Sequence, residues 1–222
     1  MITLKSALGV ATATHPGMVR SHNEDSIAAD AQIGLAVLAD GMGGYNAGEV
    51  ASGIAVELIK EEMKKALAGK RPDEVNGRSA EQLIAEHSMR ANATIYQSAQ
   101  SQPQYSGMGT TLVVALWHDN QMSVGHIGDS RLYRLRAGTL EQVTRDHSLL
   151  QEQIDSGMIT KEQARHSQNK NLVTRAVGID PEVEPEIHTY PVQAGDIYVL
   201  CSDGLNDMVT DEDIELTLSS LQ

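Results

Sequence analysis

Apolar residues recur at helical spacing in two long stretches of the first half of the chain. The first stretch follows a glycine-rich segment at 40–44, and its repeating positions are Ala47, Val50, Ala51, Ile54, Ala55, Leu58 and Ile59. A polar segment at 69–77 ends this pattern, and a second run follows with Leu83, Ile84, His87, Ala91 and Ile95. Residues three and four apart share one face of a helix, so we expect two amphipathic helices. On such a face His87 is expected to be a core histidine rather than a ligand.

Short apolar runs bounded by turn residues predict strands in the rest of the chain. The segment 8–14 is β-like, the run 33–39 ends abruptly at Asp40, and further strands are expected at 110–117, 122–127, 131–136, 186–192 and 196–201. A last helix should begin near Thr210, which stands in capping-box spacing with Asp213. The two long helices follow one another with no strand between them, which does not fit a βαβ series. The order of elements therefore predicts an α+β fold in which helices cover antiparallel sheets.

The length of 222 residues predicts one domain, 1–222. Because the chain has no Phe and one Trp, its core must be filled by aliphatic residues and methionine. The charged region 144–178 carries two short helical patterns and is expected to be an excursion from that core. The single cysteine, Cys201, ends an apolar run and is expected to be a buried thiol, and its being alone fits a reducing compartment.

Acidic residues outnumber basic ones and give the chain a net charge of −13. Such a chain repels the phosphates of nucleic acids and anionic membrane surfaces, so we expect neither as a partner. The acidic excess has two interpretations, namely an ordinary soluble surface or carboxylates clustered to bind divalent cations. The N-terminal segment resembles no signal peptide, and no apolar stretch reaches the ~18 residues of a membrane span. These features favour a cytoplasmic protein, which we expect to be a monomer.

Three aspartates stand where an apolar run meets a glycine-containing turn, namely Asp40, Asp129 and Asp203. A strand holds such a carboxylate in place, and the glycine lets the backbone come close to a ligand. Carboxylate and carbonyl oxygens are the ligands that Mg²⁺ and Mn²⁺ prefer. One Asp-Gly pair alone is an ordinary turn, but three such positions favour a site for hard divalent cations.

A second candidate segment places Arg20 shortly before the carboxylates of Glu24 and Asp25. This segment is either a solvated loop with a surface ion pair, or a site in which Arg20 binds phosphate oxygens while both acids face metal-bound water. The histidines show no zinc-ligand spacing. The glycine-rich segment lacks the Gly-Lys-Ser/Thr of a nucleotide phosphate-binding loop.

Seven segments, taken in order, resemble one family, the manganese- or magnesium-dependent Ser/Thr protein phosphatases of type 2C in their compact bacterial form. They are 19–25, 39–52, 107–116, 125–135, 144–149, 171–178 and 201–209. Each segment is a weak signal alone, but all seven in the same order are specific. The resemblance implies a β-sandwich of two antiparallel sheets flanked by helices in four layers, α-β-β-α, with 144–178 as a flap that shapes substrate access.

The resemblance also implies a role for each matching residue. Two or three Mn²⁺ or Mg²⁺ ions would be held by Asp40, the carbonyl of Gly41, Asp129 and Asp203, with Asp40 bridging two of them. Glu24 and Asp25 would hold metal-bound water, and Arg20 would bind the substrate phosphate. A hydroxide bridging the metals would then hydrolyse phosphoserine or phosphothreonine in proteins, which we expect to be substrates of a cognate kinase.

Family members usually continue with a Gly-x-Asp-Asn-x-Thr segment and a final strand, and nothing in this sequence matches them. We therefore expect one metal to bind more weakly and one strand edge to lack its partner. Two alternatives to an active protein phosphatase remain open. One is a catalytically impaired phosphoprotein-binding or regulatory module on the same fold, and the other is a phosphoesterase for small molecules.

Overall fold

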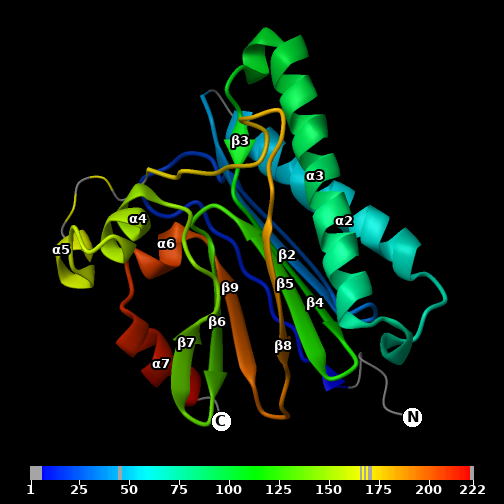
Figure 1. Ribbon diagram of the computed structural model, residues 1–222. Coiled ribbons are helices and arrows are strands. Elements are labelled where there is room, and N and C mark those ends of the chain that lie inside the picture. Colours follow the sequence, from blue (N-terminus) through cyan, green and yellow to red (C-terminus); the bar gives the residue numbers. More distant parts are fainter. Residues whose placement is uncertain (1–6, 45–46, 166, 168, 170–171, 221–222) are drawn as a thin grey trace.

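Two antiparallel β-sheets stacked face to face form the middle of the molecule, and helices lie on their outer sides (Figure 1). The computed structural model describes residues 7–44, 47–165, 167, 169 and 172–220. Within them the element order is mixed rather than alternating, as expected for an α+β fold. The predicted fold class is therefore confirmed.

The first sheet has six strands among the described residues. Its order is β1 (Asp25–Asp30), β2 (Leu35–Met42), β4 (Leu112–His118), β5 (Gln121–Ile127) and β8 (Glu186–Pro191), while β3 (Gly109–Thr110) pairs with the end of β2. The second sheet has three strands in the same part of the chain, in the order β7 (Thr139–Gln142), β6 (Arg131–Arg136) and β9 (Ile197–Cys201). All neighbouring strands in both sheets are antiparallel.

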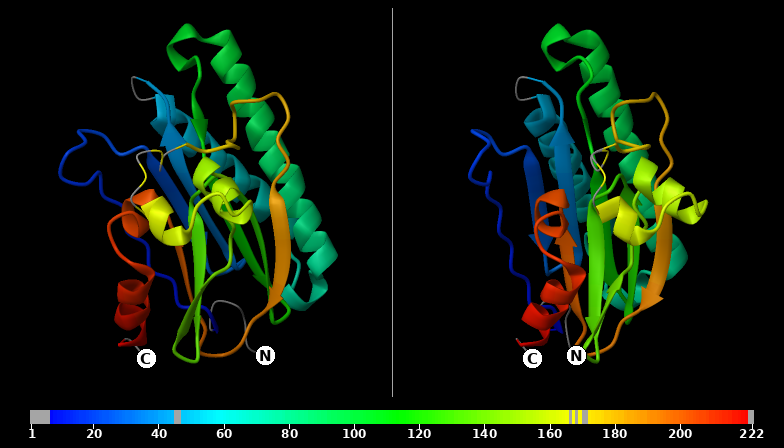
Figure 2. Two further views of the ribbon diagram at one scale, coloured as in Figure 1. Left: turned by 60° about the vertical axis from the view of Figure 1, so that its left-hand side comes forward. Right: turned by 90° about the vertical axis from the view of Figure 1, so that its left-hand side faces the viewer.

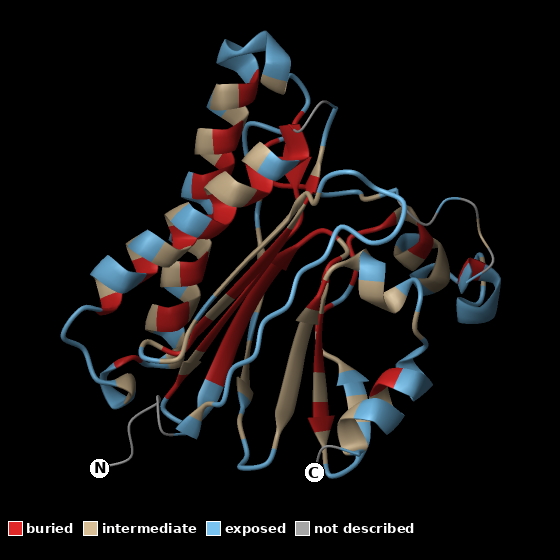
Figure 3. Ribbon diagram, turned by 180° about the vertical axis from the view of Figure 1, so that it is seen from behind, coloured by how far each residue is buried: buried red, intermediate tan, exposed pale blue. Residues whose placement is uncertain are grey.

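The two long helices, α2 (Ala47–Leu67) and α3 (Gly77–Ser101), pack on the first sheet. Figure 3 shows their buried residues on the side that faces the sheet. Ile59, Ile84 and Ile95 are fully buried there, and full burial of such an aliphatic side chain contributes about 1.5–3 kcal/mol. Both helices and the buried position of His87 are as predicted.

A second core lies between the sheets. Val113 and Met122 of the first sheet pack with Leu132 of the second. Trp117 and Tyr198 close this layer with an edge-to-face contact whose ring centroids are 5.5 Å apart. The position of β6 against the first sheet follows from this apolar contact.

The flap stands at one end of the second sheet, and the chain after β9 starts near that end and runs back beside the sheet toward its other end (Figure 2). The flap carries α4 (Leu149–Asp155) and α5 (Lys161–Arg165), and its positions 166, 168, 170 and 171 lie outside the described residues. After β9 come α6 (Asp203–Asn206) and α7 (Asp211–Ser219). Thr210 caps α7 by accepting a hydrogen bond from the Asp213 amide, as the spacing predicted. Two short 3₁₀ helices complete the described elements, at Pro72–Glu74 and Pro103–Tyr105.

Three sequence expectations need correction. The segment 8–14 is not a strand, because no neighbouring strand pairs with its backbone, and residues 9–20 are exposed. The run at 33–39 does not end at Asp40, since β2 continues through Asp40 to Met42, where β3 provides a partner. β1 and β7 were not predicted, because their sequences DSIAAD and TLEQ are short, polar and poor in β-branched residues.

Candidate metal centre

Asp25 and Asp40 stand directly opposite each other on the neighbouring antiparallel strands β1 and β2. Directly opposed side chains lie on one face of the sheet, with Cβ atoms about 4.5–5.5 Å apart. Ser202, between β9 and α6, donates a hydrogen bond of 2.8 Å to Oδ2 of Asp25. Two like charges at such a position destabilise a sheet, so the pair indicates a functional demand.

The backbone of Asp40 is held by β3 and the residue after it. The Asp40 amide donates to Oγ1 of Thr111 at 2.9 Å, and the Asp40 carbonyl accepts from Oγ1 of Thr110 and from the Thr111 amide, both at 2.8 Å. The Thr111 hydroxyl also lies 2.7 Å from the Ser130 hydroxyl, next to Asp129. These bonds fix Asp40 relative to the turn that carries Asp129.

Asp129 and Asp203 come from the second sheet's side of the site. Asp129 lies in the turn between β5 and β6, and Asp203 begins α6 directly after β9. Gly128 has a φ of +102°, and a Cβ there would lie 2.7 Å from the Thr111 side chain. Only glycine suits this turn, because other residues rarely adopt this conformation and the space is filled.

Burial and the charges of neighbouring acidic residues raise the pKa values of these aspartates. Burial, together with the charges of Asp25, Asp203 and Asp129, raises the pKa of Asp40 to about 8. Burial and the charges of Asp203 and Asp146 raise the pKa of Asp129 to about 6, and burial also raises the pKa of Asp203. Half-buried carboxylates of this kind are stabilised by cations, because a divalent ion removes the repulsion that keeps them protonated.

Two glycines let the loop at Glu24 approach the start of α2. The Gly41 amide donates to the Glu24 carbonyl at 3.0 Å, and a Cβ on Gly41 would overlap the Gly48 carbonyl. A Cβ on Gly48 would lie 2.6 Å from Oε1 of Glu24. The Glu24 carboxylate therefore sits against the first turn of α2, beside the strand that carries Asp40.

Arg20 stands at the rim of this group. Its side chain is 65% exposed, and Nη1 lies 3.8 Å from Oε2 of Glu24. The charge of Arg20 also acts to lower the pKa of Asp203, although burial outweighs it. An exposed ion pair of this kind contributes little to stability, so the guanidinium is free to meet an anion from solvent.

A cleft of about 340 Å³ opens beside the carboxylates, between the flap and the C-terminal helices. Asp129 and Asp203 line this cleft together with residues of the flap, including Leu150, Ile154, Lys161 and Arg165. Asp207 and Asp211 contribute acidic groups on the side of α6 and α7. Anything bound at the carboxylates from this side contacts the flap.

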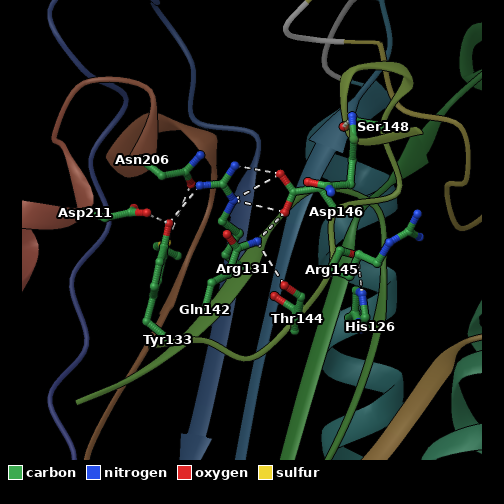
Figure 4. Close-up of polar contacts among 12 residues, drawn as sticks. His126, Arg131, Tyr133, Gln142, Thr144, Arg145, Asp146, Ser148, Asn206 and Asp211 are labelled. Atoms are coloured by element: carbon green, nitrogen blue, oxygen red, sulfur yellow. Dashed lines mark hydrogen bonds and ion pairs between the residues drawn. The ribbon is translucent and has the colours of Figure 1, made fainter. Parts of the chain in front are cut away.

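The start of the flap is fastened to β6 by an arginine fork (Figure 4). Arg131 Nη2 donates to Oδ2 of Asp146 at 2.7 Å, and Nε donates to both carboxylate oxygens at 3.0 and 3.1 Å. Nη1 donates to the Tyr133 hydroxyl, which in turn donates to Asp211 at 3.0 Å. One network thus joins β6, the flap and the start of α7 around the cleft.

One cluster of possible metal ligands was missed in the sequence. His126, His147 and Glu186 place one ligand atom each within 4.8 Å of one another, and this is the single group so close among the described residues. His126 and His147 are 21 positions apart, so no local spacing marks them. The four aspartates are more widely spread, which suits several ions rather than one.

Known proteins resemble this chain over most of its length. The family model described as protein phosphatase 2C matches residues 18–221. The serine/threonine phosphatase stp of Listeria welshimeri is 38% identical over 211 residues, covering 93% of this chain and 81% of the relative. The serine/threonine protein phosphatase PstP of Mycobacterium tuberculosis is 42% identical over 215 residues, covering 96% of this chain and 39% of the relative.

Solved structures agree with the sequence comparison. The catalytic domain of the phosphatase PstP, solved in complex with two manganese ions, has a TM-score of 0.79 and 39% identity. The aligned region covers 91% of this chain and 80% of the PstP catalytic domain. A structure described as a bacterial serine phosphatase has a TM-score of 0.83 at 33% identity, covering 93% of this chain and 82% of that one.

Proposed function

We propose, from the premise that the chain belongs to the protein phosphatase 2C family and is a metal-dependent Ser/Thr protein phosphatase, that its aspartate cluster is the metal centre. Two or three Mn²⁺ or Mg²⁺ ions are held there by Asp40, the Gly41 carbonyl, Asp129 and Asp203. The observation that carries the proposal is the convergence of acidic groups on Asp40: Asp25 lies directly opposite it on the neighbouring strand, and Asp129 and Asp203 are near enough for their charges to raise its pKa.

The donor set fits hard divalent ions. Carboxylates and a backbone carbonyl on the ends of strands are oxygen ligands, and no thiol or imidazole is among them. When bound, the ions supply Lewis acidity toward the phosphate and the attacking water. Glu24 and Asp25 accept hydrogen bonds from that water and orient it, and the backbone bonds around Asp40 keep the site in place without rearrangement.

Arg20 binds the phosphate group of the substrate. Its guanidinium is exposed at the rim of the site and presents a planar fork that matches two phosphate oxygens. The substrate is a phosphorylated Ser/Thr protein, and we assign its phosphorylation to a cognate kinase. Residues 144–178 act as the flap, because α4 and α5 line the cleft that leads to Asp129 and Asp203.

The test is hydrolysis of a phosphothreonine peptide by this chain, with Mn²⁺, with Mg²⁺ and with a chelator. We expect turnover only with a divalent ion, and none from the Asp40→Asn variant. Circular dichroism of that variant checks that the fold is intact. Turnover that survives in Asp40→Asn would remove the cluster from the reaction, and binding of phosphopeptide without turnover would favour a binding module.

A further inference from the structure

Both ends of the flap meet at one residue, His147, which is 3% exposed. On the entering side, the His147 amide donates to the Gly128 carbonyl at 2.9 Å, and the Gly128 amide donates back to Nδ1 of the His147 ring at 3.2 Å. On the returning side, the Thr174 amide donates to the His147 carbonyl at 2.8 Å. The next residue after Gly128 is Asp129, so the ring holds the turn that presents this carboxylate.

The ring's other nitrogen is also engaged. Because Nδ1 accepts a hydrogen bond, the proton of the neutral ring is on Nε2, which donates to Oε2 of Glu186 at 3.3 Å. Glu186 begins β8 and also accepts a bond of 3.0 Å from His188. His147 therefore connects the Gly128 turn with the far edge of the first sheet.

A second histidine supports the ring from one face. The rings of His126 and His147 stack with centroids 4.7 Å apart and planes 13° apart. Nε2 of His126 donates to the carbonyl of Arg145 at 2.7 Å, which holds the flap two residues before His147 (Figure 4). Burial lowers the pKa of both histidines, so both are neutral at pH 7.

The cluster is better explained as a hydrogen-bonded support than as a metal site. A metal ion bonds to the lone pair in the plane of an imidazole at about 2.0–2.1 Å. The lone pairs of two nearly parallel stacked rings do not converge on one point. Both nitrogens of His147 and Nε2 of His126 already have hydrogen-bond partners.

We propose that His147 is a positioning residue that couples the flap to the ion bound by Asp129. The inference rests on the proposed function, in which Asp129 is a metal ligand. The ring satisfies the buried Gly128 amide and so selects one conformation of the Gly128–Asp129 turn, while its backbone bonds connect that turn to both ends of the flap. Coupling of this kind is reciprocal. Ion binding at Asp129 therefore orders the flap, and an ordered flap increases the affinity for the ion.

Two near-isosteric variants separate the two ring contacts. His147→Asn keeps an acceptor near the Nδ1 position and loses the donor toward Glu186. His147→Gln keeps a donor near the Nε2 position and loses the acceptor for the Gly128 amide. His188→Ala is the matched control, because His188 contacts the same Glu186 carboxylate but is exposed and does not contact the turn.

Manganese titration by calorimetry and hydrogen exchange of residues 144–178 are the measurements. We expect His147→Gln to weaken the weakest Mn²⁺ step about three- to tenfold, the loss of roughly one hydrogen bond. Flap exchange should accelerate by a similar factor, both with and without Mn²⁺. His147→Asn should restore only part of both properties, because it keeps the acceptor for the Gly128 amide but loses the bond to Glu186. His188→Ala should match the parent chain.

Separate outcomes test the inference and the function on which it rests. Parent-like ion binding and flap exchange in His147→Gln would overturn the coupling. Asp129→Asn tests the proposed metal ligand itself. An unchanged number of bound ions in that variant would show that Asp129 is not a ligand, and the hydrogen exchange of the flap could still be interpreted. If the His147 variants fail to fold, Glu186→Ala keeps the ring but removes its partner. It should then shift both readouts in the same direction, and parent-like values would overturn the proposal.

Discussion

The carboxylates of Asp25 and Asp40 face each other across two hydrogen-bonded strands, and neither has a cationic side chain as a partner among the described residues. A sheet built for stability alone would not oppose two acids at a half-buried position. The Asp40 carboxyl responds by holding its proton, with its pKa raised to about 8 by burial and by the surrounding acids. A divalent cation at the proposed site would displace this proton and stabilise both carboxylates in their charged form.

Metal binding should release a proton at pH 7. Since the pKa of Asp40 is about 8, most molecules without metal carry a proton there, and a metal ion must displace it. Calorimetric titration with Mn²⁺ in two buffers of different ionisation enthalpy should show a release of about one proton. Heats that do not depend on the buffer would contradict this, and Asp40→Asn should abolish the buffer dependence.

The metal-free protein should lose stability as the pH rises from about 5 to 9. The Asp40 carboxyl binds its proton more tightly in the folded state, where its pKa is about 8, than in the unfolded chain, where it is about 3.9. Folded-state stability from this proton is present at low pH and is lost as the pH rises through 8. Thermal unfolding in a chelator measures the trend. Asp40→Asn should flatten the curve, and excess Mn²⁺ should reverse it.

Much of this fold was predictable because many of its helices and strands have a recognisable pattern of apolar and polar residues in their own sequence. The helical spacing in α2 and α3 and the apolar runs of β4, β5 and β6 are each visible within the residues of a single element. β1 and β7 were missed because their polar sequences become strands only when a neighbouring strand supplies the hydrogen bonds. The segment 8–14 shows the converse, since an alternating pattern forms no strand without a partner.

The candidate site divides in the same way. Asp129 and Asp203 follow strands as predicted. Gly128 lies in the predicted turn, but Gly204 lies in helix α6, so the turn predicted at Asp203 is wrong. His147 and His126 escaped prediction because the flap brings them together, and no local spacing records that contact. The fork between Arg131 and Asp146 was likewise invisible, since it depends on the return of the chain after β7.

Removing the Arg131 guanidinium should destabilise the protein substantially. Its fork to Asp146 is mostly buried, so Arg131→Ala leaves a carboxylate without its partner and should cost about 2–3 kcal/mol. Arg145→Ala is the control, because Arg145 pairs with Asp155 at an exposed position and should cost less than about 1 kcal/mol. Urea unfolding of the metal-free proteins measures both. Equal losses of unfolding free energy in the two variants would show that the Arg131–Asp146 fork stabilises the protein no more than the exposed ion pair does.

Arg20→Ala should raise KM for phosphopeptides more than it lowers kcat. In the role proposed for Arg20, the exposed guanidinium would contact the substrate phosphate both before and in the transition state, so its loss would remove binding common to both states. Steady-state kinetics at saturating Mn²⁺ provide the measurement. Arg90→Ala, which removes an exposed arginine on α3 that pairs with Glu62, should change KM less than about twofold. An unchanged KM in Arg20→Ala would remove Arg20 from the site.

Two glycines of α2 should respond in opposite ways to the same substitution. Alanine is favoured over glycine inside a helix by about 0.5–1 kcal/mol, and a Cβ on Gly53 would meet no atom closer than 4.0 Å, so Gly53→Ala should stabilise the protein by that amount. A Cβ on Gly48 would lie 2.6 Å from Oε1 of Glu24 and 2.8 Å from the carbonyl carbon of Gly41. Gly48→Ala should therefore displace Glu24 and the backbone of Gly41, and lower Mn²⁺ affinity and kcat.

The Gly53→Ala variant controls for helix propensity, because the substitution is identical and the helix is the same. Thermal unfolding measures the stability of both variants, and Mn²⁺ titration measures their affinity for the metal. Parent-like metal binding in Gly48→Ala would mean that the Glu24 loop can move without disturbing Gly41, and Glu24 would then have no part in the metal centre. A loss confined to Gly48→Ala ties the start of α2 to the metal site through a contact that only glycine permits.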